Sequence, residues 1–527
     1  MSAPAPIAVP LPELIGGLVD CGPQDDGALD IAVRGIELDS REVGPGDLFL
    51  ATFGRTHDAR EFIDAAVNQG AAAVLAESGR GWQGLRWRHG TPTPATPAPG
   101  TYGTPIIAVD HLMAKASEIA GRFYGRPSSR MSVIGITGTN GKTTCAQLIA
   151  QAFTAADCPA GVIGTLGYGV PGELAECPLT TPDAVFTQRA LAEMAAAGLG
   201  AVAMEVSSVG LHQRRVQGVR FETAVFTNLT RDHLDYHDNM EAYGASKRRL
   251  FASPGLRHAV VNLDDPFGMR VINDLGAGVE AISYGVGNRQ AGIRAEAVAI
   301  TGRGFTAEIH TPAGSGRIDC ELLGRFNVGN ALAVVGALLA CRHRLGDLGI
   351  GRICELVSGL SPVPGRMEVW GDAGDVCAVV DYSHTPDSLE GALTALRGHF
   401  DGALWCVFGC GGNRDKGKRP IMGALAEQLA DHVVITDDNP RREDGDAIAS
   451  QIRSGMKTPG AAAVERDRER AIAGAIAGAA PGDVVLIAGK GHEDYQQIGT
   501  EMRRFSDAEV ARAALSRRAR QSAGVET

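Results

Sequence analysis

The chain has 527 residues and a formal net charge of −11 at pH 7. At a usual size of about 150 residues per domain, this length predicts three or four domains. Hydrophobic residues make up 44% of the chain and charged residues 21%, a composition typical of a globular protein with several cores. The negative net charge argues against nucleic acid as the main partner, because a phosphate backbone attracts a basic surface. Small anionic substrates are not excluded, since they need only a local basic pocket.

Nothing in the sequence predicts export or membrane insertion. The first residues, MSAPAPIAVPLPELIGGL, lack a basic segment and a convincing apolar segment, so we predict no signal peptide. No apolar stretch approaches the roughly 20 residues of a membrane-spanning helix. The cysteines are scattered without a C-x-x-C pair, and Cys406 and Cys410 lie in an apolar run where we expect buried thiols. We therefore expect a cytoplasmic protein without membrane insertion.

The first part of the chain alternates short strand candidates with helical stretches. The helical stretch 61–70 ends at Gly70, a residue typical of a helix terminus. The segment 91–100 is rich in Pro and Thr, which predicts an extended, solvated insertion. A helix over 111–125 then leads into 125–130, which we interpret as a linker. The strand candidates of this part are 47–52, 71–77 and 105–110.

After residue 131 the pattern changes to apolar strands alternating with alanine-rich helices, which indicates a parallel sheet covered on both faces. The strand candidates are 132–137, 201–208, 222–229 and 258–265. A second break near 358–366 precedes another alternation of the same kind, with strand candidates 376–384, 403–411, 432–440 and 483–491. We predict an α/β protein of three domains: residues 1–128, a central parallel-sheet domain of the P-loop type at 129–360, and a Rossmann-like domain at 361–527.

The strongest single motif is GITGTNGKTTC at 135–145, which follows an apolar strand and opens a helix. Glycines let backbone N–H groups approach phosphate oxygens, and the helix N-terminus attracts negative charge. Lys142 can neutralise terminal phosphates, and the Thr143 hydroxyl can bind Mg²⁺. The longer phosphate-loop pattern is not met, because Ile136 stands where its first glycine would be. The alternative is a glycine-rich turn with an incidental lysine.

Five further motifs follow in order: AMEVSS at 203–208, TNLTRDHLDYH at 227–237, GRFNVGN at 324–330, PGRME at 364–368 and VDYSHTPDSL at 380–389. Together with TGTNGKTT they resemble the Mur ligase superfamily, which includes the folylpolyglutamate synthases, along nearly the whole chain. The resemblance implies an ATP-dependent enzyme that forms amide bonds. It also implies which residues bind ATP: Gly138, Thr139, Asn140, Gly141, Lys142, Thr143, Thr144, Asn330, Arg366, Asp381 and His384.

The resemblance further implies two Mg²⁺ ions and a catalytic group formed by Lys142, Glu205, His233 and Lys247. Thr143 and Glu205 would bind one ion, and His233 would bind the second. Lys247 matches a lysine that reacts with CO₂ in this family, and its carbamate would be a further metal ligand. Without the resemblance, Glu205 would be a capping carboxylate, His233 a structural histidine and Lys247 a surface lysine.

The first domain contains a run at 38–60 that resembles the UDP-binding segment of the family's diaminopimelate-adding branch; alone, it would be a turn-rich surface loop. Relatives often carry Asn where Leu179 stands, which removes one side-chain contact. By the same resemblance, the residues that bind the UDP-muramoyl-peptide are Leu38, Ser40, Arg55, Thr56, His57, Thr180, Thr181, Ser207, Gln213 and Arg215.

The motif DNPR at 438–441 resembles the signature of the members that add diaminopimelate. Diaminopimelate differs from lysine by a distal carboxylate, which a guanidinium can bind with two hydrogen bonds. Lysine would leave that arginine unpaired in a closed site. The implied contacts are Arg414, Asp438, Asn439, Pro440, Arg441, Gly489 and Glu493, with Glu493 pairing with an ammonium. We expect the nearby Lys416, Lys418 and Arg419 to form a solvated face.

The implied substrates are UDP-MurNAc-L-Ala-D-Glu, meso-diaminopimelate and ATP, and we expect a monomer that serves peptidoglycan synthesis. Three alternatives stay open. A lysine-adding or D-Ala-D-Ala-adding Mur ligase would differ at the DNPR motif. A folylpolyglutamate synthase has no comparable UDP-binding first domain. A regulatory protein that only hydrolyses ATP would need a partner surface in place of two substrate pockets.

Overall fold

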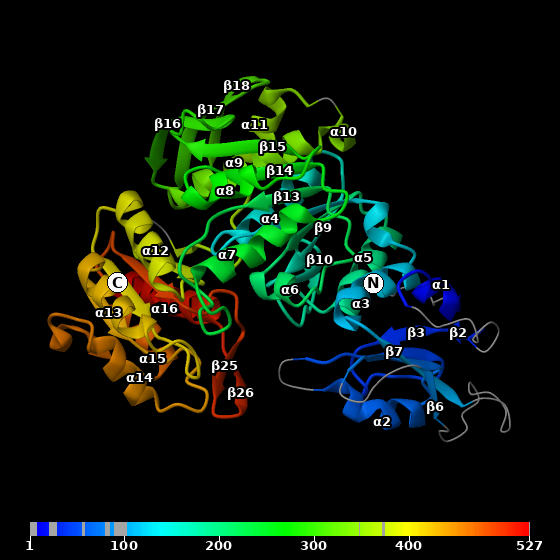
Figure 1. Cartoon of the computed structure of the whole chain (residues 1–527). Coiled ribbons are helices and arrows are strands. Elements are labelled where there is room, and N and C mark those ends of the chain that lie inside the picture. Colours follow the sequence, from blue (N-terminus) through cyan, green and yellow to red (C-terminus); the bar gives the residue numbers. More distant parts are fainter. Residues whose placement is uncertain are drawn as a thin grey trace.

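The computed structural model describes residues 8–19, 29–54, 58–79, 85–88, 103–346, 348–371 and 375–525, with the backbone alone for 85–88 and 521–525. Three α/β units follow one another along the chain, each around its own large sheet. Figure 1 shows the first unit (blue) and the C-terminal unit (yellow to red) on opposite sides of the central unit. The predicted three-domain α/β class is confirmed, while the boundaries near residues 128 and 360 remain our proposal.

The first unit is a five-stranded sheet of order β3-β4-β5-β7-β6, parallel except for β6. The three predicted strands are present as β4, β5 and β7. Helices α1 and α3 cover one face and α2 the other. Gly70, with φ of +101°, turns the chain after α2 as predicted. The predicted insertion 91–100 lies outside the described residues. The elements are β1 (Val9–Pro10), α1 (Leu11–Ile15), β2 (Ala32–Val33), β3 (Gly35–Glu37), β4 (Asp47–Ala51), η1 (Ala59–Phe62), α2 (Ile63–Asn68), β5 (Ala73–Glu77), β6 (Leu85–Arg88), β7 (Thr104–Val109), α3 (Leu112–Phe123) and η2 (Pro127–Ser129).

The central unit has an eleven-stranded sheet of order β11-β10-β9-β12-β8-β13-β14-β15-β16-β17-β18. Its middle strands are parallel, and antiparallel strands extend both edges. Helices α4, α9 and α11 pack on one face, and α5, α6 and α8 on the other. The elements are β8 (Ser132–Thr137), α4 (Lys142–Ala155), β9 (Ala160–Gly164), β10 (Gly167–Val170), β11 (Glu173–Ala175), α5 (Ala184–Ala196), β12 (Ala201–Glu205), α6 (Ser208–His212), β13 (Thr223–Phe226), α7 (Met240–Arg248), η3 (Arg249–Ala252), β14 (His258–Asn262), α8 (Pro266–Asn273), β15 (Glu280–Val286), β16 (Ile293–Thr301), β17 (Gly304–Thr311), β18 (Gly314–Cys320), α9 (Phe326–Ala340), α10 (Arg342–Leu345) and α11 (Ile350–Ser358).

The C-terminal unit has a sheet of order β19-β20-β24-β21-β22-β23, parallel except for β19, and a separate hairpin of β25 and β26. Helices α12, α13 and α14 cover one face, and α15 and α16 the other. The elements are β19 (Glu368–Gly371), β20 (Cys377–Asp381), α12 (Pro386–His399), β21 (Leu404–Phe408), α13 (Lys418–Leu429), β22 (His432–Ile435), α14 (Gly445–Arg453), η4 (Pro459–Ala461), β23 (Ala463–Val464), α15 (Arg468–Gly478), β24 (Val484–Ala488), β25 (Tyr495–Ile498), β26 (Glu501–Arg504) and α16 (Asp507–Val525).

The C-terminal unit contacts the central unit at two places on α12. At its first turn, the Asp387 carboxylate accepts hydrogen bonds from Asn140 Nδ2 (2.7 Å) and Thr230 Oγ1 (3.1 Å). At its last turn, His399 Nε2 accepts from the Gly324 amide at 2.7 Å. Loops at the carboxyl ends of the parallel strands of both sheets are thereby brought together, which is where α/β sheets bind ligands.

The cysteines behave as predicted. Cys406 and Cys410 are both buried, and the nine cysteines in the described part of the chain are all free thiols. Burial raises the pKa of the Cys410 thiol to about 12, so this side chain packs as an apolar group. Across the described ranges, none of the helices has both the length and the apolar character needed to cross a bilayer.

Candidate active site

The phosphate loop lies between the buried strand β8 and helix α4, as its motif predicts. A Cβ atom at Gly138 would lie 1.8 Å from Thr227 Oγ1, and one at Gly141 2.8 Å from Asn330 Oδ1. Both positions therefore require glycine. Helix α4 begins at Lys142, so Thr143 and Thr144 belong to its first turn, whose free N–H groups can bind phosphate.

The loop's lysine folds back over its own backbone. Lys142 Nζ donates to the carbonyl oxygens of Gly138 (2.9 Å) and Thr139 (2.8 Å). Burial lowers the pKa of Lys142, while the nearby Glu205 carboxylate opposes that shift. The ammonium thus stands at the mouth of the loop without a carboxylate directly bonded to it, as a group that receives a phosphate must.

A carboxylate lies beside the helix start. Glu205 ends β12, next to β8 in the sheet, and is buried. Its Oε2 atom accepts from Thr143 Oγ1 (2.9 Å) and Thr165 Oγ1 (3.1 Å), and Oε1 accepts from the Thr165 amide (2.8 Å). These donors are neutral, and the nearby Lys142 ammonium interacts electrostatically with the carboxylate. A buried carboxylate next to a threonine hydroxyl is a suitable pair of hard oxygen ligands for Mg²⁺.

A second group surrounds Lys247, which is fully buried and not the surface residue that its arginine neighbours alone would indicate. Its Nζ atom donates to the Gly138 carbonyl at 2.7 Å and lies 4.4 Å from the Tyr243 ring centroid. Burial, followed by the charge of Lys142, holds the pKa of Lys247 well below its usual value. Two lysine side chains, Lys142 and Lys247, therefore share one carbonyl oxygen.

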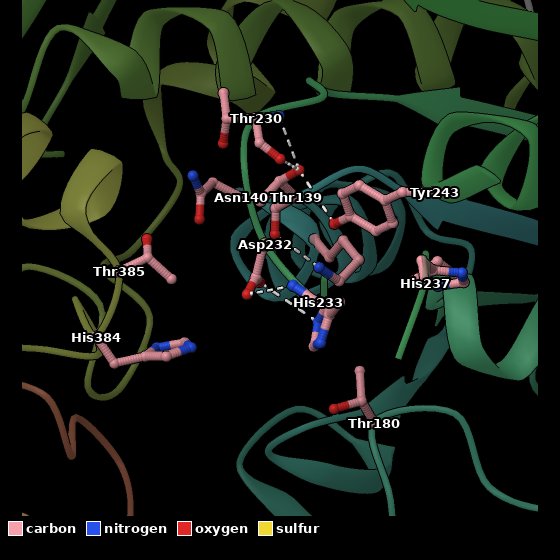
Figure 2. A network of polar contacts seen from close by, with 12 residues as sticks. Thr139, Asn140, Thr180, Thr230, Asp232, His233, His237, Tyr243, His384 and Thr385 are labelled. Carbon is pink, nitrogen blue, oxygen red and sulfur yellow. Dashed lines mark hydrogen bonds and ion pairs between the residues drawn. The ribbon is translucent and has the colours of Figure 1, made fainter. Parts of the chain in front are cut away.

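The predicted histidine stands at the open side of this group. His233 has φ of +54°, and its Nε2 atom lies 3.4 Å from Asp232 Oδ2. Burial lowers the pKa of His233, which favours the neutral, metal-binding form of the ring. Figure 2 shows His233 and Asp232 facing His384 of the C-terminal unit, with Thr180 on a third side. Residues of two domains thus surround one space.

The C-terminal unit contributes the other predicted ATP contacts. Arg366 Nη2 donates to Thr143 Oγ1 at 2.9 Å, and its guanidinium lies 4.4 Å from the Tyr382 ring centroid. Asp381 instead accepts from the Met367 amide at 2.8 Å, so it positions the segment that carries Arg366. Burial, followed by the charge of Lys418, lowers the pKa of His384 to about 4.

Asn330 lies on the opposite side of the phosphate loop, on α9 of the central unit. Its side-chain Nδ2 atom donates to Asn327 Oδ1 at 2.7 Å, and its side-chain Oδ1 atom accepts from Cys145 Sγ at 3.3 Å. The buried Asn330 side chain is thereby fixed beside the first turn of α4.

The predicted muramoyl-peptide residues of the central unit form one network next to Glu205. Thr181 Oγ1 donates to the Glu205 carbonyl (2.9 Å) and accepts from the Ser207 amide (2.9 Å). Arg215 donates to the Thr181 carbonyl (2.6 Å) and to Gln213 Oε1 (2.6 Å). The Thr180 hydroxyl lies 3.1 Å from that of Thr165, which also bonds Glu205. Leu179 is exposed, with 48% of its surface accessible.

The first unit is only partly described at its predicted site. Leu38 and Ser40 follow β3, and the Ser40 carbonyl accepts from Gln69 Nε2 at 2.9 Å. Arg55, Thr56 and His57 lie outside the described residues. Where the first and central units meet, a cavity of about 730 Å³ is lined by Phe53, Arg60, Glu77, Ser78, His111, Met113, Ala114, Arg214 and Gln217. Neither Leu38 nor Ser40 borders that cavity.

The predicted diaminopimelate residues follow three neighbouring strands, β21, β22 and β24. A Cβ atom at Gly489 would lie 2.6 Å from Asp438 Oδ2, so these two segments touch. Asn439 is buried and donates to Glu493 Oε2 at 2.9 Å. Arg441, with φ of +53°, donates from Nη1 to the Gly412 carbonyl at 3.0 Å.

Three further features complete this second group. Pro440 accepts from the Glu443 amide at 3.0 Å, which closes the turn of the DNPR motif. Arg414 is exposed on the neighbouring loop. Burial raises the pKa of Glu493, and the ammonium of Lys490, 3.1 Å away, opposes that shift. The lysine that pairs with Glu493 here belongs to the protein itself.

Sequence reasoning missed Tyr243, Lys490 and Asp387. Tyr243 precedes Lys247 by one helical turn, so their shared helix face was available as a signal. Lys490 lies between two glycines just after β24 and is fully buried. Its place after a strand resembles that of Lys142 after β8. Asp387 contacts the phosphate loop only through the arrangement of two domains, which no local pattern encodes.

The expectation of a solvated face at Lys416, Lys418 and Arg419 is wrong for two of the three residues. Arg419 has no exposed surface and bonds Glu443 at 3.0 Å. Lys418 is partly buried and donates to the His384 carbonyl at 2.7 Å. Only Lys416, with 63% of its side chain exposed, behaves as expected. Lys418 and Arg419 therefore have structural roles: Lys418 bonds the segment of His384, and Arg419 bonds Glu443 in the segment that follows the DNPR turn.

Comparison with known families accounts for this arrangement. Residues 32–124 match the profile "Mur ligase family, catalytic domain", 136–338 match "Mur ligase middle domain", and 365–491 match "Mur ligase, glutamate ligase domain". The chain belongs to the Mur ligase family. The predicted resemblance is therefore confirmed along the length of the chain.

Named Mur ligases match over nearly the whole chain. The UDP-N-acetylmuramoyl-L-alanyl-D-glutamate–2,6-diaminopimelate ligase of Coxiella burnetii is 45% identical over 490 residues, covering 92% of this chain and 96% of its own. The ligase of that name from Pseudomonas aeruginosa is 48% identical over 487 residues, covering 92% and 96%. A solved structure of that name aligns with TM-score 0.67 and 33% identity, covering 97% of this chain and 99% of that one.

Proposed function

We propose that this Mur ligase joins meso-diaminopimelate to the D-Glu carboxylate of UDP-MurNAc-L-Ala-D-Glu at the expense of ATP, in the synthesis of peptidoglycan precursors. The observation that carries the choice of amino acid is Arg441, whose guanidinium is held by the Gly412 carbonyl in the same loop as Asp438 and Asn439, while Asn439 bonds Glu493. A guanidinium there offers two parallel N–H donors to the second carboxylate of diaminopimelate. The names of relatives 45–48% identical over most of the chain support the same substrates.

The reaction has two steps. An oxygen of the D-Glu carboxylate attacks the γ-phosphorus of ATP. The bond between the γ-phosphorus and the oxygen that bridges it to the β-phosphate breaks, ADP departs, and an acyl phosphate is formed. The free amine of diaminopimelate then attacks the acyl carbon, and the carbon–oxygen bond to phosphate breaks as the nitrogen loses its proton. Lys142 and the first turn of α4 bind the phosphates, while Arg366 adds a positive charge from the other domain. His384 and Asp387, across from the phosphate loop, help to exclude water from the acyl phosphate.

The oxygen and nitrogen ligands fit Mg²⁺ at two positions. Thr143 and the buried carboxylate of Glu205 would hold one ion. His233 and a carbamate on Lys247 would hold the second. Bound Mg²⁺ supplies positive charge that reduces the repulsion between ATP and the attacking carboxylate.

The carbamate on Lys247 is part of this proposal, and the electrostatics support it. Lys142 and Lys247 donate to one carbonyl oxygen, which cannot compensate two buried ammonium groups. The depressed pKa of Lys247 favours its neutral amine, the form that reacts with CO₂. The carbamate is negative, so the reaction places an attractive charge beside the Lys142 ammonium. In ¹³C NMR, protein equilibrated with ¹³C-bicarbonate should show one carbamate carbon signal that disappears in Lys247→Arg. A spectrum that is the same for both proteins would refute the carbamate on Lys247.

The reaction consumes ATP and a nucleotide-linked precursor, which places it in the cytoplasm. We further propose that the enzyme works as a monomer.

The first experiment measures phosphate release from ATP with UDP-MurNAc-L-Ala-D-Glu, comparing meso-diaminopimelate with L-lysine. Turnover with diaminopimelate and little with lysine is the expected result. Turnover with lysine would keep the ligase and refute the proposed role of Arg441. Turnover without any amino acid would favour a regulatory ATPase.

A further inference from the structure

Beneath the DNPR turn lies a guanidinium that is completely buried. Arg419, in the first turn of α13, has no exposed side-chain surface. Removing such a charge from water costs several kcal/mol unless it is paired and hydrogen-bonded. Nothing in the chemistry described above uses this residue, so its burial calls for another reason.

The partners of Arg419 come from three segments. Its Nη1 atom donates to Glu443 Oε2 (3.0 Å), and Nη2 donates to Glu443 Oε1 (3.2 Å), which makes a two-pronged ion pair. Nη1 also donates to Gln451 Oε1 on α14 at 2.7 Å. Nη2 donates in addition to the Gly411 carbonyl at 3.1 Å. One side chain therefore joins α13, α14, the loop after β21 and the loop after β22.

Glu443 completes the connection between the two loops. Its carboxylate also accepts from the Asn413 amide, and Lys416 Nζ lies 3.3 Å away. The hydrogen bonds from Arg419 and then from Asn413 lower the pKa of Glu443 to about 2, so it stays ionised at neutral pH. The pair is a permanent charge contact and not a switch.

The two loops carry the two arginines assigned to diaminopimelate, Arg414 after β21 and Arg441 after β22. A backbone hydrogen bond joins the two loops, with the Gly412 amide donating to the Asn439 carbonyl at 2.9 Å. The two loops pack tightly, because a Cβ atom at Gly412 would lie 1.9 Å from the Pro440 carbonyl oxygen. A small shift of either loop would therefore change the separation of the two guanidinium groups.

We propose that the ion pair between the buried Arg419 and the partly exposed Glu443 is a positioning device that sets the spacing of Arg414 and Arg441, and so selects an amino acid with two carboxylates over one with a single carboxylate. This inference rests on the proposed function. Neither residue of the pair touches the substrate; both act through the loops. Selectivity is a difference of two affinities, and it is lost when the arginines fit the distal carboxylate poorly.

The test uses three variants of the full-length protein. Glu443→Gln removes the charge, and Arg419→Lys keeps the charge but loses the planar two-pronged geometry. The double variant Arg419→Met/Glu443→Leu replaces the pair with apolar side chains, a change that buried ion pairs often tolerate without loss of stability. The matched control is Arg518→Met, which breaks the ion pair with Asp375 elsewhere in the same domain.

For each variant we would measure kcat and KM for diaminopimelate, KM for ATP, and the ratio of kcat/KM for diaminopimelate over lysine. Glu443→Gln and the double variant should raise KM for diaminopimelate and lower the ratio by about tenfold or more, as expected when charge-assisted bonds are misaligned. In Arg419→Lys, the ratio of kcat/KM for diaminopimelate over lysine should lie between that of wild type and those of the other two variants. KM for ATP, and all values for Arg518→Met, should stay within about twofold of wild type.

An unchanged ratio in the double variant would overturn the proposal, whatever happens to kcat, because a purely structural pair would affect folding and not selection. If Glu443→Gln alone fails to fold, the double variant and Arg419→Lys decide. Failure of the proposed function is distinguishable, since it would appear in the wild-type protein as turnover with lysine or with neither amino acid.

Discussion

The contact between Asp387 and the phosphate loop predicts how domain closure contributes to ATP binding. Asp387 receives one hydrogen bond from Asn140 and one from Thr230, both on the central unit. A charge-assisted bond contributes about 1.5–3 kcal/mol when buried, but Asp387 is exposed, so we discount the two together to about 1–2 kcal/mol. Asp387→Ala should therefore raise KM for ATP by roughly 5- to 30-fold, because about 1.4 kcal/mol is a factor of ten.

The assay is phosphate release at saturating diaminopimelate and UDP-muramoyl-dipeptide with ATP varied, with small-angle scattering of the liganded protein beside it. The matched control is Glu390→Ala, which removes an exposed acidic residue one turn along the same helix. Asp387→Asn keeps one acceptor oxygen and should fall between the two. If Asp387→Ala binds ATP like Glu390→Ala, and both give the wild-type scattering profile, the contact does not hold the domains closed and the reasoning fails.

Three further predictions concern specificity, metal and acid stability. Arg441→Leu should lower the ratio of kcat/KM for diaminopimelate over lysine by about a hundredfold or more, as expected for loss of a two-pronged carboxylate contact; a preserved ratio would refute its role. Glu205→Gln should raise the Mg²⁺ concentration for half-maximal activity by about tenfold or more, because a neutral amide is a weaker ligand; an unchanged Mg²⁺ titration would place the ion elsewhere. Burial lowers the pKa of His237 to about 4, of His384 to about 4 and of His492 to about 3. The unfolded chain binds these protons near pH 6.5, so stability is complete above that value and falls as pH drops toward 4, by about 1.4 kcal/mol per pH unit for each histidine. Urea unfolding at pH 7 and pH 5 should show this loss, and equal midpoints would contradict it.

The sequence predicted the parallel core of each sheet well, because these strands are apolar on both faces and lie between amphipathic helices. The predicted strand 132–137 coincides with β8, and the glycines of the phosphate loop stand where a side chain would collide with a neighbour. These features are local, so a local pattern contains them. The parallel strands β9 and β15 and the antiparallel strands at both edges of the central sheet were missed. β16 alternates partly exposed residues over Ile293–Thr301 and has a register shift, which weakens its period-two pattern.

Burial of charged residues was the information least available from the sequence. Lys247 lies among two arginines in a polar segment, and Arg419 follows two lysines, so composition indicates a solvated surface for both. Each is buried because distant segments supply its partners: the Gly138 carbonyl for Lys247, and Glu443 with Gly411 for Arg419. A sequence read without relatives or coordinates cannot identify such partners.

The distribution of charge explains why the site needs two domains. In the proposed mechanism, the central unit supplies Lys142 and the first turn of α4 for phosphates, together with Glu205 as an anionic ligand. Arg366 reaches the Thr143 hydroxyl from the segment that Asp381 holds, which ties the second sheet to the first. Separation of the domains would break that hydrogen bond and open the acyl phosphate to water. The residues proposed to select the amino acid all lie on the C-terminal unit, whereas the proposed phosphate-binding residues come from both units. The proposed function therefore assigns specificity to one sheet and catalysis to the interface between two.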